Sequence, residues 1–313
     1  MYQDFAAVYD ELMDDTPYEG WGERLDSLIK KYGVSKPERD AEDVCAAGGD
    51  AEDACAVGRD AADAPGAGGD VEAAPGAGGN AEDAPGAGGD VEAALVSERN
   101  LVVDLGCGTG TLAELMYGKG YDMIGVDVSE AMLNIAMKKK EESGAEILYL
   151  LQDMRELELY STVGTVYSVC DSLNYILEED ELFEVFSLVN NYLYPGGIFI
   201  FDFNTEYKYR EVIGNTTIAE NREDCSFIWE NLYDPEEEIN EYDLTVFVRD
   251  DGERFRRFTE THFQRGYTVE QITRLVERSG MVLLEVSDAD TGEAVTAQSE
   301  RVYVVAREHG KNA

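Results

Sequence analysis

Three glycines at every second position follow a short apolar run in this chain. The stretch NLVVDLGCGTG places Asp104 two residues before Gly106, and Gly108 and Gly110 follow. Glycine lets a backbone turn tightly and lets a ligand approach without a Cβ in the way. The dinucleotide-binding spacing is G-x-G-x-x-G, with a pyrophosphate at a helix N-terminus, whereas the spacing here is G-x-G-x-G. A carboxylate beside this loop disfavours a pyrophosphate and suits a ligand that carries an ammonium group.

Further polar side chains stand at the ends of later strand-like runs. Asp127 ends YDMIGVD, Asp153 follows ILYLLQ, and Asp171 and Tyr175 follow VYSVC. Open α/β sheets bind ligands at the carboxyl ends of their strands. We therefore expect these side chains to lie at one edge of a sheet, around a positively charged ligand.

Apolar runs and helical patterns alternate after residue 99. Short continuous apolar strands between helices are typical of a parallel sheet that is covered on both faces. The sequence predicts a Rossmann-like, doubly wound α/β fold with a mostly parallel seven-stranded sheet. The expected strands are 101–105, 123–127, 147–151, 165–169, 198–202, 281–286 and 302–306, and the expected helices are 111–119, 129–142, 182–193 and 268–280.

The flanking segments have other patterns. Two N-terminal helices are expected from apolar residues at helical spacing. Residues 226–264 alternate in the β manner, with a hairpin signal at Gly252. They predict an antiparallel β lid. The expected divisions are 1–39 for a helical cap, 40–98 for an insert, 99–205 for the core, 206–267 for the lid or substrate region, and 268–313 for a closing helix, a strand pair and a frayed tail.

A ten-residue repeat rich in Ala, Gly, Asp, Glu and Pro fills residues 40–98. Successive copies read AEDVCAAGGD, AEDACAVGRD and AADAPGAGGD. Large apolar side chains are nearly missing, so burial cannot offset the entropy of ordering the segment. A calcium-binding β-roll has a nine-residue repeat. We expect a disordered acidic insert on the amino side of the first strand, away from the ligand, where a long loop is tolerated.

Charge and composition exclude several partners. The chain carries 66 acidic and 25 basic side chains, a net charge of −41. This charge repels nucleic acids and anionic membrane surfaces, so neither is expected as a partner. No apolar run approaches the roughly 20 residues of a membrane span, and the N-terminus lacks signal-peptide features, so a cytoplasmic location is expected. Five cysteines without C-x-x-C spacing indicate neither disulfides nor a metal site. The oligomeric state is not readable.

The motifs together resemble those of class I S-adenosylmethionine (SAM)-dependent methyltransferases. VVDLGCGTG is similar to the first motif of that family, YDMIGVDVSEAML to the second, LQDMREL to the third, VYSVCDSLNYI to the fourth and LYPGGIFIFDFNT to the fifth. The resemblance covers 99–205 well and 268–307 in outline, and it implies SAM as the cofactor. SAM carries a sulfonium and an ammonium but no phosphate, in agreement with an acid before the glycine loop.

The resemblance also implies roles for single residues. It implies that Asp127 binds both ribose hydroxyls. It also implies that Asp153 binds the adenine amino group and that Met154 contacts the adenine ring. The cofactor-binding set that it implies is Asp104, Gly106, Cys107, Gly108, Gly110, Asp127, Val128, Met132, Asp153, Met154, Asp171 and Tyr9.

The N-terminal stretch FAAVYDELMDDTPYEGW is similar to that of small bacterial methyltransferases of poorly defined substrate. In that subset the leading helices cover the cofactor. Tyr9 and Trp21 are then contacts of the cofactor or the substrate. The alternative interpretation is that both are core residues of two amphipathic helices.

Three residues are candidates for catalysis. Methyl transfer from a sulfonium is an in-line displacement, so the cofactor supplies the chemistry and the protein positions the reactants. A general base is needed only when the acceptor must lose its proton early. His262 is that base, or an acceptor ligand, if its strand face looks into the site; the alternative is an exposed strand histidine. Asp171 and Tyr175 follow the fourth strand and should face the same site.

The acceptor itself is not readable from the sequence. CDSLNY is not the [DNS]-P-P-[YF] box of enzymes that methylate nucleic acid bases, which with the acidic charge favours a small molecule. Cys170 is expected to be a buried packing residue. Two other functions stay open, a non-catalytic SAM-binding sensor or scaffold and a nicotinamide-binding protein. Residues expected to select the acceptor from the lid are Glu230, Tyr233, Arg254, Arg256 and Arg257.

Overall fold

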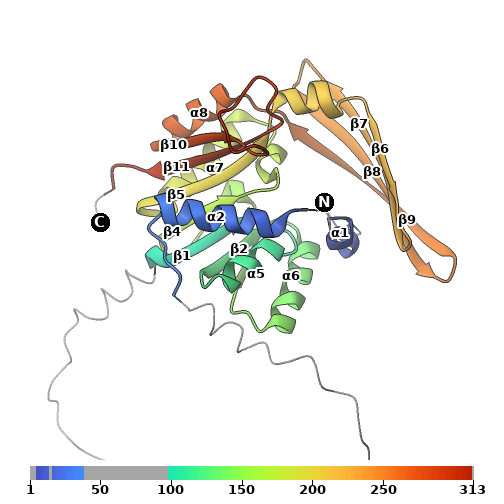
Figure 1. The fold of residues 1–313 in the computed structure, drawn as a ribbon, viewed down its shortest axis with the longest axis horizontal. Coiled ribbons are helices and arrows are strands. Elements are labelled where there is room, and N and C mark those ends of the chain that lie inside the picture. Colours follow the sequence, from blue (N-terminus) through green and yellow to red (C-terminus); the bar gives the residue numbers. More distant parts are fainter. Residues whose placement is uncertain (1–4, 14–15, 39–97, 312–313) are drawn as a thin grey trace, which may run out of the picture.

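Seven strands form a mixed sheet at the centre of the protein. The structure is a computed structural model that describes residues 5–13, 16–38 and 98–311 (Figure 1). The predicted insert lies outside these residues except for Glu98. The strand order is β10-β11-β5-β4-β1-β2-β3, in which β11 and β10 run antiparallel to their neighbours. The strands are β1 (Leu101–Leu105), β2 (Asp122–Asp127), β3 (Leu148–Leu151), β4 (Val163–Ser168), β5 (Leu193–Asn204), β10 (Met281–Asp288) and β11 (Arg301–Glu308).

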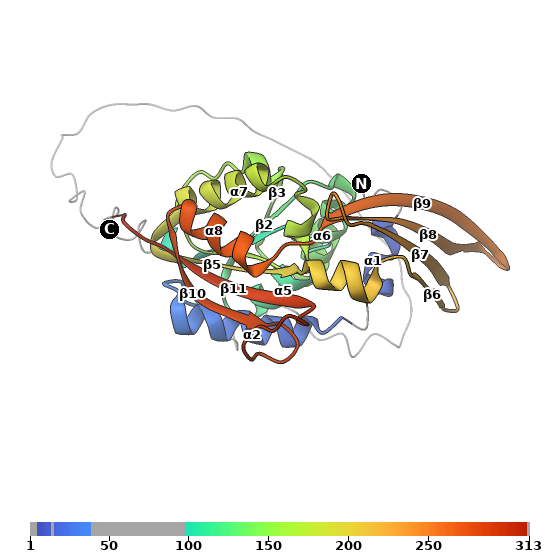
Figure 2. The same cartoon turned by 90° about the horizontal axis from the view of Figure 1, so that it is seen from above.

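Helices cover both faces of this sheet, as Figure 2 shows from above. One face packs against α7 (Glu179–Tyr192) and α8 (Val269–Arg278), and the other against α2 (Tyr18–Tyr32) and α5 (Thr111–Gly118). Side chains alternate between the faces along each strand, so Val103 and Leu105 join the first core while Val102 joins the second. The predicted doubly wound sheet with seven strands is confirmed.

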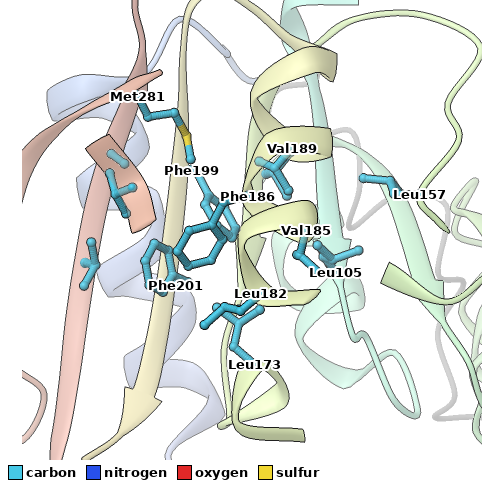
Figure 3. Packing of buried hydrophobic residues seen from close by; sticks show 14 of the residues in the cluster. Leu105, Leu157, Leu173, Leu182, Val185, Phe186, Val189, Phe199, Phe201 and Met281 are labelled. Atoms are coloured by element: carbon cyan, nitrogen blue, oxygen red, sulfur yellow. The ribbon is translucent and has the colours of Figure 1, made fainter. Parts of the chain in front are cut away.

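An aromatic cluster anchors α7 to the middle of the sheet (Figure 3). The ring centroid of Phe186 lies 5.7 Å from that of Phe199 and 5.1 Å from that of Phe201. All three side chains are fully buried. Truncating such a residue to alanine typically costs about 3–5 kcal/mol, so this cluster holds the helix that follows the fourth strand and its polar loop.

A second sheet of four antiparallel strands projects beside the body (Figure 1). Its order is β6-β7-β8-β9, and the predicted hairpin turn joins β8 to β9, where Gly252 has a φ of +59°. A π-helix, η3 (Lys208–Ile213), leads into it from β5. The strands are β6 (Thr217–Asn221), β7 (Cys225–Asp234), β8 (Ile239–Asp251) and β9 (Arg254–Arg265). We call this sheet the lid sheet. Its alternation places His262 and Gln264 on the buried face of β9.

The first helix joins the body to the lid sheet. In α1 (Ala6–Leu12), Val8 packs with Met132 of α6 (Glu130–Ser143) and with Leu244 of β8. Both predicted N-terminal helices therefore form. Among the described residues, no helix is long and apolar enough to cross a membrane.

The chain after β11 differs from the predicted frayed tail. The strand continues to Glu308, which is buried. Lys311 then donates hydrogen bonds from Nζ to the backbone carbonyls of Asn191 at 2.9 Å and Leu193 at 2.8 Å. Carbonyls left free at the end of α7 attract this cation, and the expectation of fraying is wrong up to that residue.

The two chain segments that flank the insert meet at the amino end of β1. Asn100 donates a hydrogen bond to Glu38 at 2.9 Å and accepts one from the backbone of Lys36 at 3.2 Å. Ser35 donates to the carbonyl of Arg99 at 3.1 Å. The glycine loop follows the opposite, carboxyl end of β1. The insert therefore begins and ends on the side of the sheet expected from the sequence.

Candidate functional site

One large cavity lies between the carboxyl edge of the seven-stranded sheet and the lid sheet. Its volume is about 870 Å³, which lies in the range of small-molecule sites. Its walls come from the glycine loop, the end of β2, the loop after β4, α1, α2, η3 and the inner face of the lid sheet. Predicted site residues that line it are Tyr9, Trp21, Asp104, Gly106, Cys107, Gly108, Asp127, Val128, Met132, Asp153, Met154, Asp171, Tyr175 and His262.

The glycine loop bends sharply where it reaches the cavity. Gly106 has a φ of +86°, and a Cβ built on it would lie 2.7 Å from Oγ of Ser172. A Cβ on Gly108 would meet no atom within 4 Å, so this residue faces open space. The loop thus leaves its backbone accessible to a ligand.

Gly110 has a different role from the one expected. It does not line the cavity, although its φ is +76°. A Cβ there would lie 2.4 Å from Oη of Tyr149 and 2.9 Å from Cβ of Ala136. Glycine is needed at this position for close packing at the start of α5 and not for direct contact with the cavity.

Asp127 shapes the loop as well as the cavity. Its two carboxylate oxygens accept hydrogen bonds from the backbone N–H groups of Gly108 and Ser129, each at 2.8 Å. Burial raises the pKa of this carboxyl above its ordinary value. A carboxylate has about four lone-pair sites, so Asp127 can accept two further hydrogen bonds from a ligand.

Asp104 is a buried acid in the wall of the cavity. The residue is 3% exposed, its Oδ2 atom is buried, and the hydroxyl of Tyr167 on β4 lies close enough to its carboxylate to lower its pKa in part. Desolvation raises the pKa of Asp104 to about 8. A ligand cation placed against this oxygen would stabilise the ionised form.

The second and third motifs also contribute residues to the cavity wall. Asp153 forms an ion pair with Arg155 at 2.6 Å, and hydrogen bonds from Arg155 lower the pKa of the Asp153 carboxyl. Met154 follows it in a short 3₁₀ turn. Val128 is 57% exposed, whereas Met132 is buried. The exposed Val128 and the thioether of Met154 offer apolar surface for a flat ring.

The first helix is tied directly to the glycine loop. Thr109 donates a hydrogen bond to Oδ1 of Asp10 at 2.6 Å, and Lys139 of α6 forms an ion pair with the same carboxylate at 2.6 Å. Tyr9, next to Asp10, and Trp21 of α2 both line the cavity. They are cavity residues as well as partly buried members of two hydrophobic clusters.

The loop after β4 holds two residues in the left-handed region. Cys170 has a φ of +64° and Asp171 a φ of +53°, conformations that non-glycine residues adopt only when surrounding contacts hold them. The buried Asp202 accepts both of their backbone N–H groups, at 3.2 and 2.9 Å. Cys170, expected to be a buried packing residue, is partly exposed and lines the cavity.

Asp171 is fixed by two side chains that the sequence did not reveal. Arg301 of β11 donates to its Oδ1 at 2.6 Å, and Gln264 of β9 donates to its Oδ2 at 2.7 Å. Arg301 also pairs with Asp202 at 3.1 Å. The carboxylate of Asp171 is therefore ion-paired and held in place, which suits a structural role at the cavity wall.

Tyr175 and His262 come together across the cavity. Oη of Tyr175 lies 3.4 Å from Nδ1 of His262 and 2.6 Å from Oη of Tyr242. The imidazole is 1% exposed and stacks on the ring of Tyr242, with centroids 4.9 Å apart. Burial lowers the pKa of His262, so the ring is neutral at pH 7. The alternative of an exposed histidine is wrong.

The residues expected to select the acceptor do not line the cavity. Arg254, Arg256 and Arg257 are exposed on β9, and Glu230 is exposed on the outer face of β7. Tyr233 is buried, but it packs beside Gly214. Alternation does not tell which face of a strand turns inward. The lid and η3 residues that line the cavity instead are Lys208, Tyr209, Phe227, Trp229, Tyr242, Leu244 and Gln264.

Comparison with known proteins places the chain in a family. Residues 102–197 match the methyltransferase domain family. YqeM of Bacillus subtilis (strain 168), named as a methyltransferase, is 36% identical over 215 residues, which cover 68% of this chain and 86% of YqeM. A protein of Geobacillus sp. (strain WCH70), also named as a methyltransferase, is 29% identical over 98% of this chain and 99% of its own length.

A solved structure agrees with the sequence relatives. An S-adenosylmethionine-dependent methyltransferase from Clostridium acetobutylicum ATCC 824 is 31% identical, with a TM-score of 0.63 over 71% of this chain and 90% of that one. The glycine loop, the acids at the strand ends and the sheet order described above are what the motifs of this family require. The chain belongs to the class I SAM-dependent methyltransferase family.

Proposed function

We propose that this protein transfers the methyl group of SAM to a small-molecule acceptor that binds between the glycine loop and the lid sheet. One observation carries the proposal. The same cavity is lined at one end by the glycine loop, Asp104 and Asp127, and at the other by Tyr175 and His262. A donor and an acceptor bound there would share one enclosed space, which is the arrangement that a group transfer needs.

The residues at the first end fit SAM. Asp127 keeps acceptor capacity for two ribose hydroxyls, and Gly108 leaves room beside the loop. The carboxylate of Asp104, which lines the cavity, suits the α-ammonium group. Val128 and Met154 offer apolar surface to the adenine ring. SAM supplies an electrophilic methyl group on a sulfonium; the residues of the chain bind it, orient it and exclude water.

The acceptor end is mostly aromatic. Phe227, Trp229 and Tyr242 contribute rings from the inner face of the lid sheet. His262 is neutral at pH 7 because of its burial, so it can take a proton from an acceptor hydroxyl or ammonium group directly or through Tyr175.

Size and charge favour a small acceptor. The cavity volume of about 870 Å³ must hold the donor as well as the acceptor. The net charge of −41 opposes binding to polyanions. We infer that neither a nucleic acid nor a membrane lipid surface is the partner.

Calorimetry tests whether the protein binds SAM. SAM and its demethylated product are expected to bind the wild-type protein, and Asp127→Ala is expected to lose at least tenfold in affinity because the ribose loses its acceptor. Asp243→Ala, on the outer face of β8, is the matched control and keeps wild-type affinity. Lack of binding by the wild type at high micromolar SAM would contradict the proposal.

Turnover separates a transferase from a sensor that only binds SAM. The wild-type protein is incubated with methyl-labelled SAM and bacterial metabolite extract. Label is expected in a low-molecular-mass product and not in nucleic acid. Tight SAM binding without label transfer over a broad acceptor panel would favour the non-catalytic alternative.

A further inference from the structure

We propose that Glu260 is a positioning residue that orients His262 so that its Nδ1 atom accepts the proton arriving through Tyr175. The inference rests on the proposed function, because the proton comes from the methyl acceptor. It adds a residue that neither the family motifs nor the cofactor site includes.

The geometry of β9 places the carboxylate behind the imidazole. Glu260 and His262 are two residues apart on one strand, so both side chains face the cavity side of the lid sheet. Oε2 of Glu260 lies 3.6 Å from Nε2 of His262, and Oη of Tyr175 lies 3.4 Å from Nδ1 on the other side of the ring. The imidazole thus stands between a carboxylate and a hydroxyl.

Three neighbours fix the orientation of the ring. Tyr242 stacks on it with an interplanar angle of 13°, and Tyr175 meets it edge-on with an angle of 71°. A carboxylate accepts but does not donate, so Glu260 favours the tautomer with hydrogen on Nε2. Nδ1 then carries the lone pair, on the side of Tyr175.

The carboxylate is itself held by the first helix. The backbone N–H of Phe5, at the start of α1, donates to Oε1 of Glu260 at 3.2 Å. The other oxygen, Oε2, remains the one nearer to His262. Docking of α1 against the lid sheet therefore places Glu260 for its role.

Charge and burial both act on the pKa of His262. Glu260 from β9 raises the pKa of His262, whereas burial and the positive charge of the amino terminus lower it. Tyr242 from β8 and Tyr175 from η2 (Ser172–Tyr175) are titratable groups that also contact the ring. Glu260 is thus the negative charge that stabilises a protonated His262.

The proton path balances with methyl transfer. The acceptor forms a bond to the methyl carbon, and the carbon–sulfur bond breaks with its electron pair left on sulfur. The acceptor proton passes to Oη of Tyr175 while the hydroxyl proton of Tyr175 passes to Nδ1 of His262. The resulting imidazolium is paired with Glu260 until its proton leaves to solvent.

Nuclear magnetic resonance can test the inference without a known acceptor, because the chain contains only two histidines, His262 and His309. His309→Gln leaves a single imidazole to observe. The ¹⁵N and ¹H spectrum of that variant at pH 7 is expected to show hydrogen on Nε2 and a bare Nδ1. Hydrogen on Nδ1 would overturn the inference, whatever any further substitution does.

The role of the carboxylate is tested in the same background. Glu260→Gln is expected to lower the measured pKa of His262 by about 0.5–1 unit, because an opposite charge within about 4–6 Å is lost, and Glu260→Asp should restore part of the shift. Asp243→Asn, on the outer face of the neighbouring strand, is the control and leaves the titration unchanged. Equal titration curves in Glu260→Gln and the parent would also overturn the inference.

The outcome is distinguishable from failure of the proposed function. SAM affinity measured by calorimetry should stay within about threefold of the parent in Glu260→Gln, because the amide oxygen of glutamine can still accept the hydrogen bond from Phe5 that holds α1. Normal SAM binding together with hydrogen on Nδ1 of His262 would contradict only the proposed role of Glu260. Failure of the wild type to bind SAM would contradict the proposed function. The spectrum of His262 does not depend on that result.

Discussion

Asp104 is a buried acid that lowers the stability of the ligand-free protein and offers a charge for binding a cation. The unfolded side chain ionises near its ordinary pKa of 3.8, whereas burial holds the folded pKa at about 8. Between these values the unfolded state releases a proton that the ligand-free folded state keeps, so stability falls as the pH rises from about 4 to 8. A cation that binds Oδ2 reverses this loss for the bound state.

SAM binding should therefore release a proton. At pH 6.5 an α-ammonium group is fully charged while Asp104 is mostly protonated. We expect release of up to one proton per SAM bound, and an affinity that rises from about pH 6 to about pH 7, below the pH at which the α-ammonium group itself loses its proton. Calorimetry in two buffers with different ionisation enthalpies measures this release. Equal heats in both buffers for the wild type would contradict the role of Asp104.

Asp104→Asn separates the two effects at this residue. The neutral amide removes the cost of a buried ionisable group, so we expect it to raise the free energy of unfolding by about 1–3 kcal/mol at pH 7.5. The same change should weaken SAM binding and abolish proton release. Urea denaturation measures the change in the free energy of unfolding, and calorimetry measures the SAM affinity and the proton release. A less stable variant with normal affinity would show that the acid is structural.

At the scale of elements, α1 closes the cofactor end of the cavity. It contacts the glycine loop through Asp10 and Thr109, the helix α6 through Lys139, and the lid sheet through Glu260. A short helix gains little stability on its own, so its position depends on these contacts. We therefore expect this helix to be the part of the wall that opens when ligands exchange.

Asp10→Asn is expected to loosen this contact. Loss of the charge weakens the hydrogen bond from Thr109 and removes the ion pair with Lys139, so SAM should dissociate roughly 3- to 10-fold faster. The thermal midpoint should hardly change, because the pair is partly exposed. Stopped-flow displacement measures the rate, with Glu23→Gln on the exposed face of α2 as control. Equal rates in Asp10→Asn and the control would show that α1 does not gate the cofactor.

The sequence predicts the elements of the Rossmann-like body well, because buried parallel strands are short apolar runs. The lid sheet is harder to predict, because each strand carries apolar residues on both faces. Trp229 and Ile228 are equally apolar neighbours, and only the fold shows that Trp229 lines the cavity while Ile228 is exposed on the other face. The assignment of Glu230 failed for this reason, whereas Arg254 shares a face of β9 with His262 but lies at the hairpin end of the strand, beyond the cavity.

The missed site residues share a physical cause. Lys208 lies on a π-helix, whose sequence has neither strand nor helix periodicity. Arg301 is the first residue of β11, an antiparallel strand that starts at the carboxyl edge of the sheet. Its position follows from sheet order, which local patterns do not contain. The acids of the cofactor end were predicted because each directly follows, or ends, a recognisable strand.

At the scale of the whole molecule, the described residues that flank the insert lie at the end of the sheet opposite the cavity. Glu38 and Asn100, which flank the insert, are already hydrogen-bonded to each other. A chain that skips the repeats therefore has a short gap to close, and loop-closure cost depends weakly on length. The body does not need the repeats to bring its halves together.

Deleting residues 41–95 should leave SAM affinity within about threefold of wild type and the thermal midpoint within a few degrees. Calorimetry and thermal denaturation of the shortened chain, compared with the full chain, check both values. A tenfold loss of affinity would show that the repeats contribute to the site. Replacing Asn100 with alanine in the shortened chain should then cost stability without changing affinity.

The most direct test of the whole account is a crystal structure with the demethylated product of SAM bound. We expect its nucleoside at the carboxyl edge of the seven-stranded sheet, with both ribose hydroxyls on Asp127, its ammonium group at Oδ2 of Asp104, and its sulfur turned toward Tyr175 and His262. A nucleoside bound elsewhere, or one at this edge with Asp104 and Asp127 making no contact to it, would contradict the account.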